Sequence, residues 1–208
     1  MMSLPGKLIV IEGIEGCGKS TLAKNVAEKL RAVGRRVVLT KESGGSALGV
    51  QLRAILHEQK GVTAQAEYLL FAADRAQHFE EVVVPGLHAG ALVISDRMAD
   101  SSLAYQGYGR GLDVDMITRI NRWVMRDIAS DLVIYLDISV DEAYARVQSR
   151  GHTLTTFERE ARPFWEKVKQ GYEEIFSTRR DVVRFDARLS AAELADKAYA
   201  CITGLLHE

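Results

Sequence analysis

Residues 13–20 read Gly-Ile-Glu-Gly-Cys-Gly-Lys-Ser and match the pattern G-x-x-x-x-G-K-[ST]. A short run rich in β-branched residues, KLIVIE at 7–12, precedes them, and apolar residues then recur at helical spacing over 19–33. The pattern therefore stands between a predicted strand and a predicted helix, which is the context that indicates a phosphate-binding loop. A tight strand-to-helix turn that binds no nucleotide is the structural alternative.

The loop carries the chemistry that a triphosphate requires. Its glycines allow backbone N–H groups to point inward, and a helix that starts near Lys19 adds the positive end of its dipole. Lys19 would reach the β- and γ-phosphates, and the Ser20 hydroxyl would hold one Mg²⁺ position. We expect nucleotide contacts from Gly13, Ile14, Glu15, Gly16, Cys17, Gly18, Lys19, Ser20 and Thr21.

Asp96 is a candidate for a second metal ligand. It follows the apolar run ALVIS at 91–95, where a carboxylate at the end of a neighbouring strand can approach a metal ion. An aspartate that caps the next helix is the alternative. The presence of a phosphate loop in the same chain favours the metal.

Apolar periodicity alternates between strand and helix along the chain. Strands are predicted at 7–12, 36–40, 91–95, 132–136 and 181–185, and helices at 19–33, 47–58, 64–87, 100–106, 113–129, 140–150, 157–179 and 191–206. This alternation predicts an α/β fold with a five-stranded parallel, doubly wound sheet and helices on both faces. We expect one domain over 1–208, with a short lid at about 150–160.

Composition limits the classes of partner. Among 208 residues, 27 basic and 28 acidic side chains nearly cancel, which favours neither a nucleic acid nor a membrane as partner. The two cysteines, Cys17 and Cys201, are far apart and show neither disulfide-scaffold nor metal spacing. No targeting segment is recognisable, so we expect a cytoplasmic protein.

Four blocks of sequence identify a resemblance to a known family. The phosphate loop has an acidic third residue, Glu15, and TKESGGS at 40–46 matches T-R-E-P-G-G-T. LLFAADRAQH stands at 69–78, and a block from 96 to 112 matches D-R-x-x-x-S-S-L-A-Y-Q-G-x-G-R-G-L. Along nearly its whole length the chain resembles the bacterial-type thymidylate kinases, which are P-loop nucleoside monophosphate kinases. The resemblance implies transfer of the γ-phosphoryl group of ATP to dTMP, with Mg²⁺ as cofactor.

The resemblance also implies roles for individual residues. Lys19 and Arg97 would be catalytic, and Glu15 would order the acceptor site. Arg75 and Arg97 would hold the phosphate of dTMP and the approaching γ-phosphate, as the planar guanidinium suits. The acceptor nucleotide would further contact Glu42, Phe71 under the thymine, Ser102 and Gln106 near the base edge, and Tyr105 beside the deoxyribose. Without the resemblance, Phe71 would be assigned to the core, Arg75 and Arg97 to surface ion pairs, and His78 to a solvated helix position.

The chain departs from the family in the lid. Where the family has D-R-x-E, this chain has Thr155-Thr156-Phe157-Glu158, so the expected catalytic arginine is missing. Arg150, which opens the polar insert, is the first candidate to replace it, ahead of Arg146, Arg159 and Arg162. Smaller departures are Lys41 for arginine, Ser43 for proline and Met98 for an aromatic residue.

Two other functions remain open at this point. The chain could phosphorylate another pyrimidine monophosphate, such as dUMP, or it could be a nucleotide-binding regulator whose lid no longer supports catalysis. The intact Lys19, Arg75, Asp96 and Arg97 favour an active enzyme. The resemblance also implies a homodimer packed through the helices of the region 47–87.

Overall fold

The computed structural model describes residues 4–58, 61–149, 151 and 154–206. These residues form a single parallel sheet of five strands in the order β2-β3-β1-β4-β5. The strands are β1 (Lys7–Glu12), β2 (Val37–Lys41), β3 (Leu92–Asp96), β4 (Leu132–Asp137) and β5 (Val182–Asp186). The predicted fold class is confirmed, and each predicted strand lies within one residue of an observed one.

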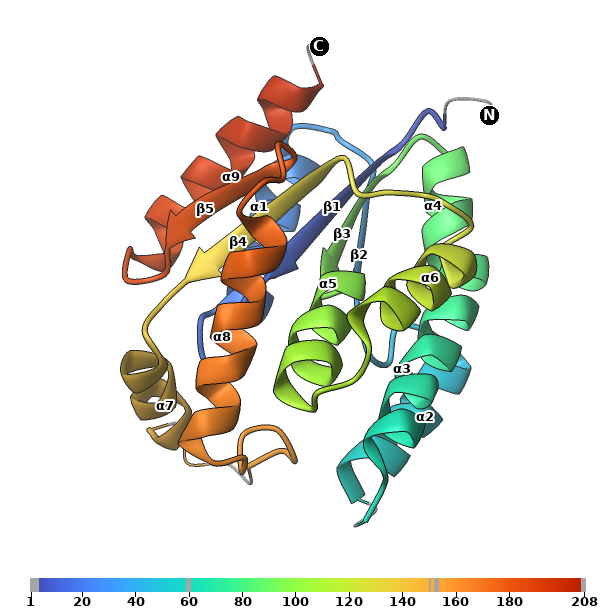
Figure 1. Ribbon diagram of the computed structural model, residues 1–208. Coiled ribbons are helices and arrows are strands. Elements are labelled where there is room, and N and C mark those ends of the chain that lie inside the picture. Colours follow the sequence, from blue (N-terminus) through green and yellow to red (C-terminus); the bar gives the residue numbers. More distant parts are fainter. Residues whose placement is uncertain (1–3, 59–60, 150, 152–153, 207–208) are drawn as a thin grey trace.

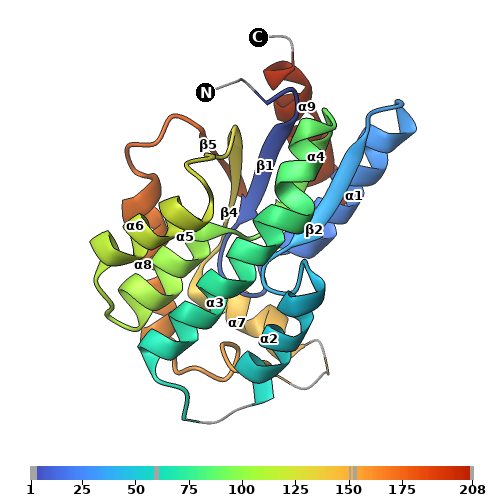
Figure 2. The ribbon, with the colours of Figure 1, turned by 90° about the vertical axis from the view of Figure 1, so that its right-hand side faces the viewer.

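Helices cover both faces of the sheet (Figures 1 and 2). Helices α1 and α9 pack on each other against one face, while α4, α5 and α8 lie on the other. The α-helices are α1 (Lys19–Ala32), α2 (Ala47–Glu58), α3 (Ala64–His78), α4 (Val84–His88), α5 (Ala99–Ser102), α6 (Val114–Val124), α7 (Val140–Gln148), α8 (Arg162–Phe176) and α9 (Ala191–Leu205). The π-helical segments are η1 (Phe79–Val83) and η2 (Leu103–Gly109).

The central strands are almost wholly buried, which explains their continuous apolar sequences. In β1, the residues from Leu8 to Ile11 are at most 2% exposed, and β3 and β4 flank it on either side. A strand with helices on both faces has no solvent side, so it does not alternate apolar and polar residues. The same burial makes Glu12, the last residue of β1, conspicuous because its carboxyl group is also inaccessible.

Four predicted helices differ from the observed ones by more than two residues or in type. The helix predicted at 100–106 is observed as α5 followed by η2. The helix predicted at 157–179 begins only at Arg162, because Pro163 stands in its first turn, where proline fixes a helix start. The helix predicted at 113–129 ends at Val124, since Arg126 and Asp127 have left-handed φ angles of 55° and 58°. The predicted helix 64–87 is observed as α3, η1 and α4 in unbroken succession.

Helix α8 and segment η2 pack closely through small residues. A Cβ atom added to Gly171 of α8 would lie 2.8 Å from the Cγ atom of Tyr108, at the base of that side chain. A Cβ atom added to Gly109 of η2 would lie 2.7 Å from the Cε2 atom of Phe164. This contact joins the helix that follows the predicted lid to the segment that carries Tyr105 and Gln106.

The substitution Gly171→Ala tests this contact. We expect the free energy of unfolding to fall by about 1–3 kcal/mol, because the root of the Tyr108 side chain cannot move aside without shifting η2. Gly204→Ala in α9 is the control, since a Cβ atom there meets no atom within 4 Å. Urea unfolding of both variants measures the difference. Equal stability of the two variants would contradict the close packing.

Candidate active site

The phosphate loop connects β1 to α1 and depends on glycine backbone geometry. Gly16 and Gly18 have φ angles of 80° and 101°, a region that side-chain-bearing residues rarely adopt. A Cβ atom on Gly16 would also lie 2.5 Å from the carbonyl oxygen of Ala143, at the start of α7. The loop is therefore held in its curled form by both torsion and packing.

Lys19 folds back over this loop. Its ammonium group donates a hydrogen bond of 2.8 Å to the carbonyl oxygen of Ile14 and lies 3.5 Å from the Sγ atom of Cys17. The side chains of Ile14 and Cys17 belong to the apolar core. These two residues, together with Gly13, therefore offer a ligand their backbone rather than their side chains.

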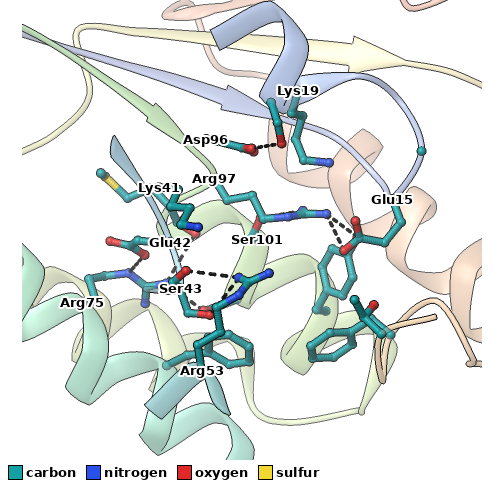
Figure 3. Close-up of a pocket in the computed structure, with 18 of the residues that line it drawn as sticks. Glu15, Lys19, Lys41, Glu42, Ser43, Arg53, Arg75, Asp96, Arg97 and Ser101 are labelled. Atoms are coloured by element: carbon teal, nitrogen blue, oxygen red, sulfur yellow. Dashed lines mark hydrogen bonds and ion pairs between the residues drawn. The ribbon is translucent and has the colours of Figure 1, made fainter. Parts of the chain in front are cut away.

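Ser20 and Asp96 meet at the start of α1 and the end of β3. The Ser20 hydroxyl donates a short hydrogen bond to Oδ2 of Asp96 (Figure 3). Both are hard oxygen ligands of the kind that Mg²⁺ prefers. Within the described residues, no cluster of three or more His, Cys, Asp or Glu side chains is placed to hold a metal ion. A pair of oxygens fits Mg²⁺ in particular, because this ion commonly takes its other ligands from phosphates and water.

A pocket of about 440 Å³ opens beside the loop. Residues from the phosphate loop, β2, α3, β3, α5 and η2 line it together. The residues predicted from the sequence that line it are Glu15, Gly16, Gly18, Lys19, Ser20, Thr21, Glu42, Phe71, Arg75, Asp96, Arg97, Ser102, Tyr105 and Gln106. The structure thus gathers around one cavity residues that are as far apart in the chain as Glu15 and Gln106.

Arg97 lies between the loop and the acceptor end of this pocket. Its guanidinium group forms an ion pair of 2.7 Å with Glu15 (Figure 3). It also donates hydrogen bonds to the carbonyl oxygen of Gly13 and to the hydroxyl of Tyr105. Burial alone would raise the pKa of Glu15, but the charges of Arg97 and Lys19 outweigh it and lower the pKa to about 2. Glu15 is therefore an anion at neutral pH and holds one edge of Arg97.

Arg75 is anchored from every side. It is 1% exposed, and its Nε atom donates to Glu42 at 2.8 Å. Its two terminal nitrogens donate to Asn121 at 2.6 Å and to Ser102 at 3.0 Å. Burial would raise the pKa of Glu42, yet the Arg75 charge and the hydrogen bond from His78 lower it below its ordinary value. Arg75 therefore enters the pocket as a fixed group rather than a mobile surface cation.

His78 is not solvated, and that prediction was wrong. Its ring is completely buried, with one nitrogen 2.6 Å from the Thr40 hydroxyl and the other 3.2 Å from the Glu42 carboxylate. Helical periodicity could not reveal these contacts, because β2 and the residue directly after it supply the two partners. His78 thus supports Glu42, which in turn supports Arg75.

Aromatic rings form the remaining wall of the pocket. Phe71 is partly exposed to the cavity, and its ring centre lies 6.0 Å from that of Phe157. Phe157 also meets Tyr105 edge to face at 5.4 Å. The amide of Gln106 donates to the buried carboxylate of Glu67 at 3.0 Å, which fixes its orientation. Phe157 belongs to the predicted lid, so this segment contributes to the wall.

Several lining residues were not assigned to the site from the sequence. They are Lys41, Ser43, Arg53, Met98, Ser101, Thr155 and Phe157. Arg53, on α2, donates to the carbonyl oxygen and hydroxyl of Ser43 at 3.1 and 3.3 Å, which brings a further cation to the acceptor end (Figure 3). Its position shortly after the glycine-rich turn at 44–45 was the available signal.

Four arginines are candidates for the missing lid arginine, and their positions differ from one another. Arg150 lies outside the described residues. Arg146 donates to the carbonyl oxygen of Ala187, and Arg162 forms exposed ion pairs with Asp141 and Glu166. Arg159 is exposed. None of these last three lines the described pocket.

A parallel sheet with this loop at the end of β1 defines a P-loop nucleotide-binding protein. The same pocket also contains Arg75, Arg97 and the ring of Phe71, which suit a second nucleotide and so indicate a nucleotide kinase. The family model for thymidylate kinase matches residues 11–198. The chain belongs to the thymidylate kinase family.

Individual relatives agree with the family model. The chain is 43% identical to a thymidylate kinase of Nostoc punctiforme, over 89% of this chain and 90% of that protein. It is 39% identical to a thymidylate kinase of Halothermothrix orenii, over 97% and 98%. It is 45% identical to a thymidylate kinase of Geobacter sulfurreducens, over 80% and 82%. In the part of the chain that the structure describes, no helix is both long and apolar enough to cross a bilayer.

The buried carboxyl of Glu12 predicts a pH dependence of stability. Burial, reinforced by Asp100, raises its pKa from 4.5 to about 7, so the folded protein holds a proton there that the unfolded chain has released. The contribution of Glu12 to stability is therefore greatest below pH 4.5 and falls as the pH rises to 7. We expect the difference in unfolding free energy between the wild type and Glu12→Gln to change by about 3 kcal/mol across this window, to the disadvantage of the wild type.

Urea unfolding of both proteins between pH 4.5 and pH 8 measures this change. Glutamine does not titrate, so its altered hydrogen bonds add a constant difference, and only the protonation of Glu12 makes the difference vary with pH. A difference that stayed constant with pH, or that moved in favour of the wild type as pH rose, would contradict the raised pKa.

Proposed function

We propose that this protein transfers the γ-phosphoryl group of ATP to dTMP and releases dTDP and ADP. One observation carries this: a single pocket has a phosphate loop at one end, and Arg97, Arg75 and two aromatic rings at the other. Such a pocket accommodates two phosphorylated molecules with their phosphates facing each other. Membership of the thymidylate kinase family identifies the acceptor as dTMP and the protein as an enzyme.

Catalysis by these residues is electrostatic. Phosphoryl transfer has a loose transition state with charge on the equatorial oxygens, so it needs alignment and positive charge more than a covalent nucleophile. Lys19 would meet the β- and γ-phosphates, and Arg97 would bridge the γ-phosphate and the acceptor phosphate. Glu15 would orient Arg97 through the 2.7 Å ion pair. Mg²⁺ held by Ser20 and Asp96 would add charge neutralisation at the donor phosphates.

The acceptor end would select dTMP by shape and by fixed polar groups. Phe71 would stack on the thymine ring, with Gln106 and Ser102 at the base edge and Tyr105 beside the deoxyribose. Arg75, held by the Glu42 carboxylate, would bind the phosphate of dTMP together with Arg97. The anchoring of Arg75 and Gln106 by buried carboxylates supports these roles, because groups fixed before binding lose little entropy on binding.

The segment at about 150–160 would act as a lid over the single domain formed by residues 1–208. The ring contacts of Phe157 with Phe71 and Tyr105 support this, since they join the segment to the acceptor wall. A closed lid excludes water from the transfer and strengthens the charge contacts inside. Arg150 remains our choice for the arginine that this lid supplies.

We also propose a homodimer through the helices of 47–87. Leu48, Val50 and Ile55 of α2 and Leu69 of α3 are large apolar side chains exposed on this region. A cytoplasmic location accords with the free thiols of Cys17 and Cys201.

The principal test is a coupled assay with ATP, Mg²⁺ and a panel of nucleoside monophosphates. We expect the largest kcat/KM for dTMP, and we expect Lys19→Met to lower kcat at least about 100-fold, because a charge that meets the transferring phosphoryl group is lost. Lys29→Met is the matched control, since Lys29 lies in the last turn of α1, forms an exposed ion pair with Asp196 and should leave turnover unchanged.

Each outcome of the assay has a clear meaning. A larger kcat/KM for another pyrimidine monophosphate would show that this nucleotide, and not dTMP, is the acceptor. Binding of both nucleotides without production of ADP would identify a regulator rather than an enzyme.

A separate set of variants tests the lid arginine. We expect Arg150→Ala to lower kcat by about 100-fold or more with little change in the KM for ATP, the effect expected when a transition-state cation is removed. Arg146→Ala, Arg159→Ala and Arg162→Ala are compared under the same conditions. Unchanged turnover in Arg150→Ala beside a large loss in Arg159→Ala or Arg162→Ala would show that another arginine has this role.

A further inference from the structure

Glu12 is a buried carboxyl group directly beneath the proposed transfer site. It is completely inaccessible to solvent, and four hydrogen-bond donors converge on it. The backbone N–H groups of Met98 and Ser101 donate at 2.8 and 3.3 Å, and the hydroxyls of Ser101 and Tyr172 donate at 2.6 and 2.8 Å. No role in binding a nucleotide explains this group, since it does not line the pocket.

The same two hydroxyls contact Arg97. Its Nη1 atom lies 3.0 Å from the Ser101 oxygen and 3.2 Å from the Tyr172 oxygen. A guanidinium group can only donate hydrogen bonds, so both hydroxyl oxygens must present lone pairs to it. Each hydroxyl has one hydrogen, which must therefore point away from Arg97. The two hydroxyl oxygens also lie 2.9 Å apart, so one hydroxyl can donate to the other, and at least one of them must then donate to Glu12 Oε2. Glu12 therefore fixes the polarity of the two groups that hold the guanidinium.

Glu12 also holds the backbone on which Arg97 stands. Arg97 has a φ angle of 72°, a strained conformation for a residue with a long side chain. Its N–H group donates to the carbonyl oxygen of Ile11, and the following N–H group, that of Met98, donates to Glu12. Two adjacent residues of β1 thus keep the peptide units on both sides of this strained residue in place.

We propose that Glu12, through Ser101 and Tyr172, is a positioning residue that aims the Arg97 guanidinium group at the transferred phosphoryl group. The proposal rests on the proposed function, because it assigns Arg97 to that group. Tyr172 lies on α8, the helix that follows the lid, so the same hydroxyl links α8 to the transfer site. Burial raises the pKa of Glu12 to about 7, so the charged carboxylate at this position costs stability at neutral pH and above.

A double-mutant cycle separates positioning from structural support. Tyr172→Phe removes one oxygen atom, and Glu12→Gln places an amide donor where the carboxylate received hydrogens. Each change is made in the wild type and in Arg97→Ala, and single-turnover rates are measured at pH 8 with excess enzyme and labelled ATP, so that slow variants remain measurable.

We expect Tyr172→Phe and Glu12→Gln each to lower the rate about tenfold in the wild type, the size of one hydrogen bond to a charged group. The KM for ATP should stay within about twofold, because the phosphate loop is unchanged. In Arg97→Ala neither change should lower the rate further, since residues that act through one group are not additive with its loss.

The matched control is Tyr135→Phe. Tyr135 is buried in the same aromatic cluster, with its ring 5.4 Å from that of Tyr172, but its hydroxyl points to Glu173. We expect it to leave the rate unchanged. Equal losses for Tyr172→Phe with and without Arg97, or a loss in Tyr135→Phe as large as in Tyr172→Phe, would overturn the proposal and leave a structural role.

Two further results keep the interpretation clear. Thermal unfolding of every variant shows whether it folds, and should Glu12→Gln fail to fold, Tyr172→Phe alone decides the question. If the wild type does not phosphorylate dTMP, the proposed function fails. If the wild type is active and Arg97→Ala is slow but uncoupled from Tyr172, only the positioning role fails.

Discussion

The parallel pairing of β1 with β3 is the constraint from which the site follows. Ile11 pairs with Asp96, so the phosphate loop after β1 and the residues after β3 leave the sheet at the same edge. This register places Ser20 against Asp96 and Arg97 against the carbonyl oxygen of Gly13. Strand β2 pairs with the other side of β3, with Lys41 opposite Asp96, and thereby brings Glu42 to the same edge. Donor and acceptor groups meet because three adjacent strands end together.

Two arginines at this edge of the sheet are each paired with a glutamate. The chain has a formal net charge of −1, yet a pocket of modest size contains Lys19, Lys41, Arg53, Arg75 and Arg97. Acidic partners make this density tolerable: Glu15 holds Arg97, and Glu42 holds Arg75. Buried charges are costly unless they are paired and hydrogen-bonded. Glu15 and Glu42 therefore hold Arg97 and Arg75 in place before a nucleotide binds.

Local sequence was sufficient for the elements and for the residues next to them. Strand positions, the loop at 13–20 and the acid at 96 could be predicted because each depends on a few neighbouring residues, such as the β-branched run before Gly13. Helix starts and ends were less accurate where a single proline or a left-handed residue decided them, as at Pro163 and Arg126.

The supporting contacts of the site could not be predicted in this way. Glu12 and Tyr172 are 160 positions apart, and His78 meets Thr40 across two elements, so no periodicity relates them. A glutamate at the end of an apolar strand and a histidine in a helix look solvated until the packing of the sheet is known.

Phosphoryl transfer requires both the right groups and their exact orientation, and these two requirements depend on different parts of the chain. The groups that touch nucleotides occur in short motifs, whereas their orientation depends on α8 packing against η2 closely enough, at Gly171 and Gly109, to bring the Tyr172 hydroxyl to Arg97. The motifs thus determine which groups are present, and the packing of α8 against η2 determines the direction in which Arg97 points.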